Sequence, residues 1–150
     1  MTPSDLEHYL HDHIPLSRAM AVQVISLSDD KVILGAPLAP NINHRDTVFG
    51  GSASSVAILA AWSLLHIKLV AASFPSRVVI QRNSMDYLLP IAGDFTAVSA
   101  LEPTENWDRF VRMLSRKGVA RIAITSELIY EDAVAGRLHG EFVAFANDRL

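Results

Sequence analysis

The sequence has 150 residues, of which half are hydrophobic and 19% are charged, and its formal net charge is −3 at pH 7. This length suits one domain over residues 1–150, and the charge gives no electrostatic basis for binding nucleic acid or an anionic membrane. The chain has no cysteine, which excludes disulfides, thiolate catalysis and cysteine-ligated zinc and favours a reducing, cytoplasmic location.

The first third of the chain predicts a helix and then two strands. Thr2 is a suitable N-cap for the helix, and Pro15 marks its end. The strands expected here are residues 20–28 and 31–36, and two aspartates between them suit a hairpin turn.

A long helix is predicted from Gly51 to Val70. It is apolar on every side, so we expect other elements to surround it. Ser63, His66 and Lys68 interrupt it, whereas a membrane span needs about 20 predominantly apolar residues. We therefore expect a buried helix and no membrane association.

Four strands and one short helix are predicted in the second half. Trp107, Phe110 and Leu114 recur at helical spacing before Gly118, a suitable helix end. The strands expected are residues 77–89, 93–101, 119–130 and 134–146. This order of elements predicts an α+β fold in which an antiparallel sheet wraps round the long helix.

Two motifs flank the long helix. They run Asn43-His44-Arg45-Asp46-Thr47-Val48-Phe49-Gly50-Gly51 and Tyr87-Leu88-Leu89-Pro90-Ile91-Ala92-Gly93-Asp94. Together they resemble the hotdog-fold thioesterase superfamily, most closely the thioesterase domain of the YiiD C-terminal type, which occurs alone or behind an acetyltransferase domain. The resemblance implies a six-stranded hotdog sheet and a homodimer paired edge to edge, with the active site at the subunit seam. It leaves open whether dimers form tetramers.

The activity that the resemblance implies is hydrolysis of an acyl thioester by an activated water. The partner would be an acyl-coenzyme A or an acyl carrier protein. No separate cofactor and no metal are expected, because coenzyme A or phosphopantetheine would be part of the substrate.

The glycine pair offers donors for this chemistry. Two glycines at a helix start leave backbone N–H groups free at the positive end of the helix dipole, and they let a carbonyl approach closely. Gly51 is the candidate oxyanion donor, with Phe49, Gly50 and Ser52 as substrate-binding neighbours. Alternatively, the pair only allows the helix to start close to the sheet.

Two loop residues are candidates for handling water. In relatives an asparagine at the position of Asn43 positions the water or the thioester, and His44 could act as the base. The alternatives are an asparagine that organises its own loop and a surface histidine.

The third strand offers a second candidate base. Alternation places Ile80, Arg82, Ser84 and Asp86 on one face, so Asp86 could activate water with Ser84 beside it. The alternative is a solvated or interfacial ion pair between Arg82 and Asp86.

The chain departs from one branch of relatives at two polar positions. Where that branch has a carboxylate on the helix and a hydroxyl in the third strand, this chain has Ile58 and Ile80. This departure motivates one alternative to hydrolysis, a module that binds acyl thioesters without turnover. A separate alternative is a 3-hydroxyacyl thioester dehydratase or hydratase. The lack of an acid on the helix argues against the dehydratase.

A basic stripe is predicted on the short second helix. Arg109, Arg112 and Arg116 lie at i, i+3 and i+7 and could bind coenzyme A phosphates or an acidic carrier protein. The alternative is a polar face that keeps an amphipathic helix soluble.

Overall fold

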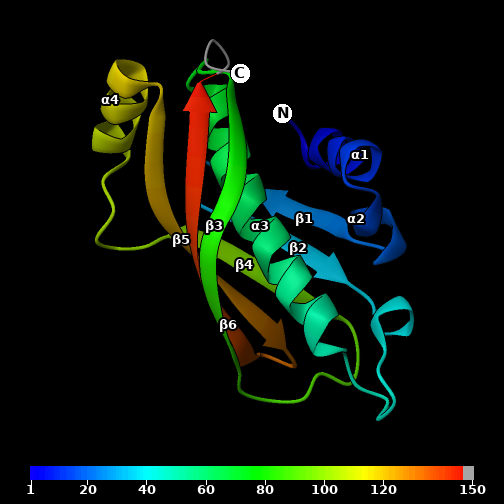
Figure 1. Ribbon diagram of the computed structural model, residues 1–150. Helices are drawn as coiled ribbons and strands as arrows, with labels where there is room; N and C mark the ends of the chain where they lie inside the picture. The colour runs from blue at the N-terminus through cyan, green and yellow to red at the C-terminus, as the bar shows by residue number, and fades with distance from the viewer. Residues whose placement is uncertain (147–150) are drawn as a thin grey trace.

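The computed structural model describes residues 1–146 as an antiparallel sheet wrapped round one helix (Figure 1). The elements in chain order are α1 (Pro3–His13), α2 (Pro15–Ala19), β1 (Gln23–Leu27), β2 (Val32–Ala36), the 3₁₀ turn η1 (Ala39–Asn41), α3 (Gly50–Ala71), β3 (Ser76–Tyr87), β4 (Phe95–Leu101), α4 (Trp107–Lys117), β5 (Val119–Tyr130) and β6 (Ala133–Ala146). The six strands form one sheet in the order β1-β2-β4-β5-β6-β3. The predicted α+β hotdog architecture is confirmed.

The central helix α3 supplies one side of the core. Its residues that face the sheet, among them Val56, Ala60 and Leu64, are fully buried, as the all-round apolar pattern predicts. Ser126 of β5 ties the helix to the sheet, because its hydroxyl donates to the Ala57 carbonyl oxygen at 2.7 Å. By length and composition α3 could cross a membrane, but 61% of its most apolar window is buried inside the fold, as in a core helix.

The N-terminal helix begins as the sequence predicts and ends differently. Thr2 and Asp5 form a reciprocal capping box, and this hydrogen bonding to Thr2 lowers the pKa of Asp5. After α1 ends at His13, Pro15 starts the separate helix α2, because proline suits the first position of a helix. The first strand consequently begins at Gln23 instead of residue 20.

Helix α1 lies against the start of β1, the strand at one edge of the sheet. Glu7 Oε1 accepts a hydrogen bond from the Val24 backbone N–H at 2.8 Å, and His11 Nε2 lies 2.8 Å from the Val22 carbonyl oxygen. Side chains of α1 therefore occupy main-chain groups that an edge strand would otherwise expose.

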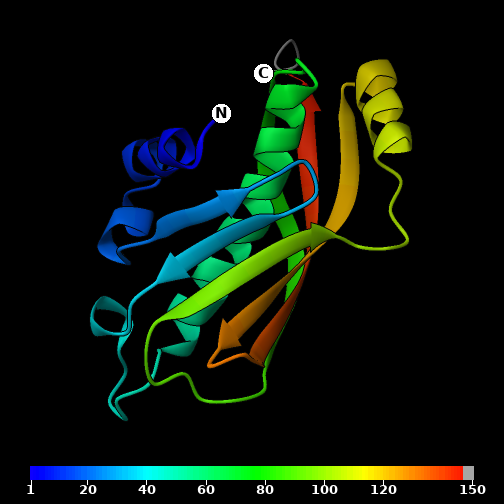
Figure 2. The ribbon, with the colours of Figure 1, turned by 180° about the vertical axis from the view of Figure 1, so that it is seen from behind.

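The other edge of the sheet is β3, which pairs only with β6 among residues 1–146. A bulge at Gln81 separates two registers, so that Ile80 lies opposite Phe142 and Arg82 lies opposite Glu141. Because Phe142 is buried against α3 and Glu141 is exposed, the strand presents Ile80 to the inner face and Arg82 to the outer face. Figure 2 shows the other part of the sheet, where β1, β2 and β4 cross in front of the helix.

Candidate active site at the start of the central helix

The first turn of α3 has free hydrogen-bond donors. The helix begins at Gly50, and its N-cap residue Phe49 provides no side-chain cap. Within residues 1–146, the N–H groups of Gly50, Gly51 and Ser52 have no acceptor, and Ala53 is the first to bond, to the Phe49 carbonyl oxygen at 3.0 Å. Three donors at the positive end of a 22-residue helix can therefore bind a carbonyl or oxyanion.

A cavity of about 300 Å³, lined mainly by apolar residues, lies beside this helix start. Its walls come from the loop before α3, the first turn of α3, the turn after β3 and the sheet. The lining residues are Val48, Gly50, Ala53, Tyr87, Leu88, Leu89, Pro90, Ile91, Leu128 and Ala135. An apolar group can thus lie next to the free donors.

Aromatic rings cover both glycines. The Tyr87 hydroxyl donates to the Gly50 carbonyl oxygen at 3.2 Å, and a Cβ at Gly50 would lie 3.5 Å from the Tyr87 ring. A Cβ at Gly51 would lie 2.4 Å from the exposed ring of Phe49. The absence of side chains at both glycines thus lets the rings lie directly on the helix start.

Asn43 holds the loop together, as in the alternative interpretation of its sequence motif. Its Oδ1 accepts from the N–H groups of Arg45 and Thr47, at 2.7 and 3.2 Å. Its Nδ2 donates to the Thr47 hydroxyl at 2.9 Å and approaches the Val48 carbonyl oxygen at 3.5 Å. Both ends of the amide are used inside the loop, so Asn43 positions the residues that precede the glycines.

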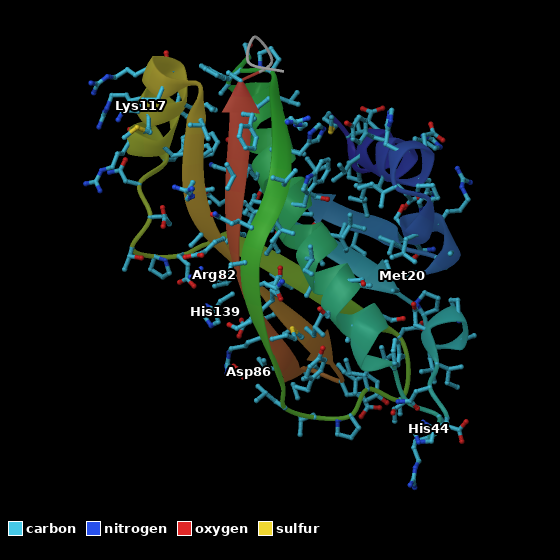
Figure 3. The ribbon with its side chains drawn as sticks, in the orientation of Figure 1. Met20, His44, Arg82, Asp86, Lys117 and His139 are labelled. Carbon is cyan, nitrogen blue, oxygen red and sulfur yellow. The ribbon has the colours of Figure 1, made fainter. Side chains whose placement is uncertain are left out.

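His44 and Asp86 lie in different surroundings. His44 is exposed in the loop at the same end of α3 as the glycine pair (Figure 3). Asp86 lies on the outer face of the sheet, opposite Arg137, whereas Gly51 lies on the inner side with α3. A strand added at the edge of a sheet continues both faces, so edge pairing leaves Asp86 on the outer face as well. The structure therefore does not bring Asp86 to Gly51, and the role of Asp86 as base stays a prediction.

Ser84 and Arg82 also lie on the outer face, away from the helix start. Ser84 is directly opposite His139 of β6, whose Nδ1 lies 2.6 Å from Glu102 Oε1. The predicted common face is wrong for Ile80, because the bulge at Gln81 turns it inward. Within one subunit the structure thus does not bring Ser84 to the glycine pair.

The three arginines of α4 are exposed on the far end of the molecule. Figures 1 and 2 both place α4 level with the last turns of α3, and a helix of 22 residues is about 33 Å long. Arg109, Lys117 and Arg121 line a separate groove of about 490 Å³ there. Within one subunit the structure does not bring Arg109, Arg112 and Arg116 to the glycine pair.

Sequence reasoning missed Tyr87 and the turn that follows it as parts of the site. In the sequence, the motif from Tyr87 to Asp94 carries only the family resemblance, yet residues 87–91 form one wall of the cavity. The Val48 N–H bonds to the Ile91 carbonyl oxygen at 2.8 Å and joins this turn to the loop before α3. The signal was an exposed aromatic and two leucines in a turn, where polar residues are usual.

Known proteins share this fold. A solved structure of a protein of unknown function from Chlorobaculum tepidum is 28% identical, with a TM-score of 0.90 over 97% of this chain and 98% of that one. A structure described as a putative thioesterase from Shewanella oneidensis is 23% identical, with a TM-score of 0.86 over 95% and 96%. A thioesterase structure from Haemophilus influenzae is 10% identical, with a TM-score of 0.77 over 97% and 92%.

These likenesses define a thioesterase-like hotdog protein. A family model described as "Putative thioesterase (yiiD_Cterm)" matches residues 3–146, and the chain belongs to that family.

Proposed function

We propose that the protein hydrolyses an acyl thioester of coenzyme A or of a carrier protein, as a cytoplasmic homodimer. The observation that supports this most strongly is the uncapped start of α3, which lies beside a cavity lined mainly by apolar residues. A thioester needs both features, because its carbonyl oxygen requires donors and its acyl chain requires an apolar environment.

In the proposed reaction the thioester oxygen accepts hydrogen bonds from the first-turn N–H groups, with Gly51 as the principal donor. Water attacks the carbonyl carbon, negative charge develops on the oxygen, and the carbon–sulfur bond breaks to give a carboxylic acid and a thiol. Donors placed for the oxyanion contribute about 3–4 kcal/mol each in well-studied hydrolases. The acyl chain lies in the cavity that Val48, Ala53 and Leu89 help to line.

We assign the base to His44. Three histidines lie on α1, His66 lies in the second half of α3, and His139 lies on the outer face. His44 is therefore the histidine at the glycine end, and an imidazole can accept the proton of an attacking water at neutral pH. Its position in the loop that Asn43 organises supports this assignment.

The open edge of β3 supports the proposed homodimer. This strand has 12 residues, and large apolar side chains along it and just beyond it are about half exposed. They are Val79, Tyr87, Leu88 and Leu89. A long edge strand with exposed apolar residues is a template for pairing with another strand, which a second copy would cover.

A thiol-release assay tests the function. Purified protein would be given acyl-coenzyme A thioesters of graded chain length and an acyl carrier protein, with free thiol followed by a chromogenic disulfide. We expect release that depends on enzyme concentration and falls in His44→Gln. Tight binding without thiol release would replace the hydrolase with the binding module, and neither binding nor release would overturn both.

A further inference from the structure

The cavity beside the start of α3 has an open mouth and a buried inner end. The side chains at its mouth, Tyr87, Leu88 and Leu89, are each about half exposed. The side chains at its inner end are buried, with Ala53 3% exposed and Leu128 1% exposed. An apolar chain that enters at the mouth therefore leaves water as it advances, and this transfer is favourable.

A hydrogen bond between helix and sheet closes the inner end. Ser126 of β5 is fully buried, and its hydroxyl donates to the Ala57 carbonyl oxygen at 2.7 Å. Ser126 shares the inner face of β5 with Leu128, and Ala57 lies one turn of α3 beyond Ala53. Helix and sheet are thus in direct contact at the level of Ala57, and the cavity ends before that level.

Leu128 is held in place at the inner end by its neighbours in the sheet. It lies opposite Gly136 in the pairing of β5 with β6. A Cβ added at Gly136 would lie 3.2 Å from Leu128 Cδ1 and 2.9 Å from Met85 Cε. The Leu128 side chain therefore lies directly on Gly136, beside Met85, and forms a fixed inner wall.

The distance from the helix start to the closed end limits the length of a bound chain. Ala57 lies seven residues after Gly50, which is about 10 Å along the axis at a rise of about 1.5 Å per residue. With carbon–carbon bonds of about 1.5 Å in a zigzag chain, about eight carbons span that length. The cavity volume of about 300 Å³ agrees, because it lies at the lower end of ligand pockets, about 300–1,000 Å³.

The lining also selects by charge. Among residues 1–146, no charged side chain lines the cavity. The Tyr87 hydroxyl at the mouth donates its hydrogen bond to the Gly50 carbonyl oxygen. A carboxylate or ammonium group at the far end of an acyl chain would lose its hydration at the inner end without gaining a partner. The cavity therefore suits an uncharged aliphatic chain.

We propose that this cavity is a closed site for uncharged aliphatic acyl groups of up to about eight carbons, and that Leu128 and Ala53 set its depth. The proposal rests on the proposed function, because the first-turn N–H groups are taken as the place of the thioester oxygen. Leu128 and Ala53 then determine specificity for chain length.

Ketone analogues of acyl-coenzyme A test the depth without hydrolysis, because a methylene separates their carbonyl from the sulfur. Titration calorimetry with straight chains of increasing length should show Kd falling about fourfold for each methylene buried. The fall should stop at about eight carbons counted from the carbonyl, because later methylenes stay in water. A Kd that falls steadily to the dodecyl analogue, or that ignores chain length, would overturn the closed site.

Two substitutions should move this length limit in opposite directions. Ala53→Val should lower it by about two carbons and Leu128→Ala should raise it by about three, because a closely packed end has no other room. Ala53→Val should fold even if Leu128→Ala does not, since its added methyl groups enter the cavity. Leu34→Ala is the matched control for Leu128→Ala, because Leu34 is equally buried but lies on β2 outside the cavity. A limit that moves in the control, or in neither cavity variant, would refute the assigned roles.

A charged chain tests the class of acyl group. The analogue that ends in a carboxylate at its eighth carbon should bind at least about tenfold more weakly than its uncharged counterpart, and equal binding would overturn selection by charge. Thiol release is then measured with the matching thioesters. If ketone binding shows the expected limits but no thiol is released, only the proposed hydrolysis fails. If thiol is released without any length limit, only the closed site fails.

Discussion

The Tyr87 hydroxyl donates a hydrogen bond to the Gly50 carbonyl oxygen at 3.2 Å and thereby joins the end of β3 to the first residue of α3. The same ring lies against the glycine and forms part of the cavity wall. One side chain thus couples the position of the edge strand to the proposed acyl site.

Two substitutions of Tyr87 separate the contribution of its hydrogen bond to stability from the contribution of its ring to the cavity wall. Tyr87→Phe removes an exposed hydrogen bond but keeps the ring, so the free energy of unfolding should fall by at most about 1 kcal/mol. Tyr87→Ala removes the wall as well and should lower kcat/KM for acyl thioesters at least several-fold more than Tyr87→Phe. Urea unfolding and thiol release measure the two effects. Equal kcat/KM in the two variants would show that the ring does not contact the acyl group.

The N–H of Gly51 can be deleted with little effect on the helix. Proline is tolerated in the first turn because those N–H groups are unpaired. Gly51→Pro should lower kcat by about 10²–10³-fold, the cost of one oxyanion donor. Gly51→Ala is the matched control, because it keeps the N–H and only displaces the exposed Phe49 ring. If both variants lose activity equally, the loss comes from the ring and Gly51 is not the donor.

Asn43 should behave as a residue that positions its loop. Asn43→Ala removes bonds to Arg45 and Thr47 and should destabilise the protein by about 1–2 kcal/mol, with faster hydrogen exchange at those two amides. Asn43→Asp keeps the two accepted bonds and should lie between the alanine variant and wild type. Lost hydrolysis with unchanged stability and exchange would show instead that Asn43 acts on the substrate.

The stability should fall in mild acid because of His66. Burial lowers the pKa of His66 below its ordinary 6.5, and His13 lowers it further. The unfolded chain therefore binds a proton first as the pH falls below about 6.5, and stability is lost from there through the folded-state pKa. His66→Gln should make the free energy of unfolding vary less between about pH 7.5 and pH 5. An identical slope in His66→Gln would exclude His66 as its source.

The sequence predicted the elements well because each is marked by local chemistry. The capping box at Thr2 and the all-round apolar pattern of α3 depend on neighbouring residues alone. The side of the sheet to which Asp86 points depends instead on a bulge five residues earlier in the strand. A single extra residue at Gln81 turns Arg82, Ser84 and Asp86 to the outer face while Ile80 stays inside, and alternation in the sequence contains no mark of that bulge.

Only part of the site was predicted, because only part of it depends on neighbouring residues in the sequence. The free donors at the glycine pair follow from helix geometry and are present. The use of the Asn43 amide within its loop, and the contact of Tyr87 with Gly50, are set by how two loops meet in space. Amphipathic spacing correctly placed a helix at 107–117, but it could not show that its arginines lie at the end of the molecule remote from Gly50.

The contacts of α1 with Val22 and Val24 make the two borders of the sheet unequal. A sheet with two open borders can recruit copies without limit and grow into a fibre. Here residues of α1 block the start of the β1 edge, and pairing between two β3 strands would cover the β3 edge. Growth would then stop at two subunits, so Glu7 and His11, remote from the glycines, would set the size of the assembly.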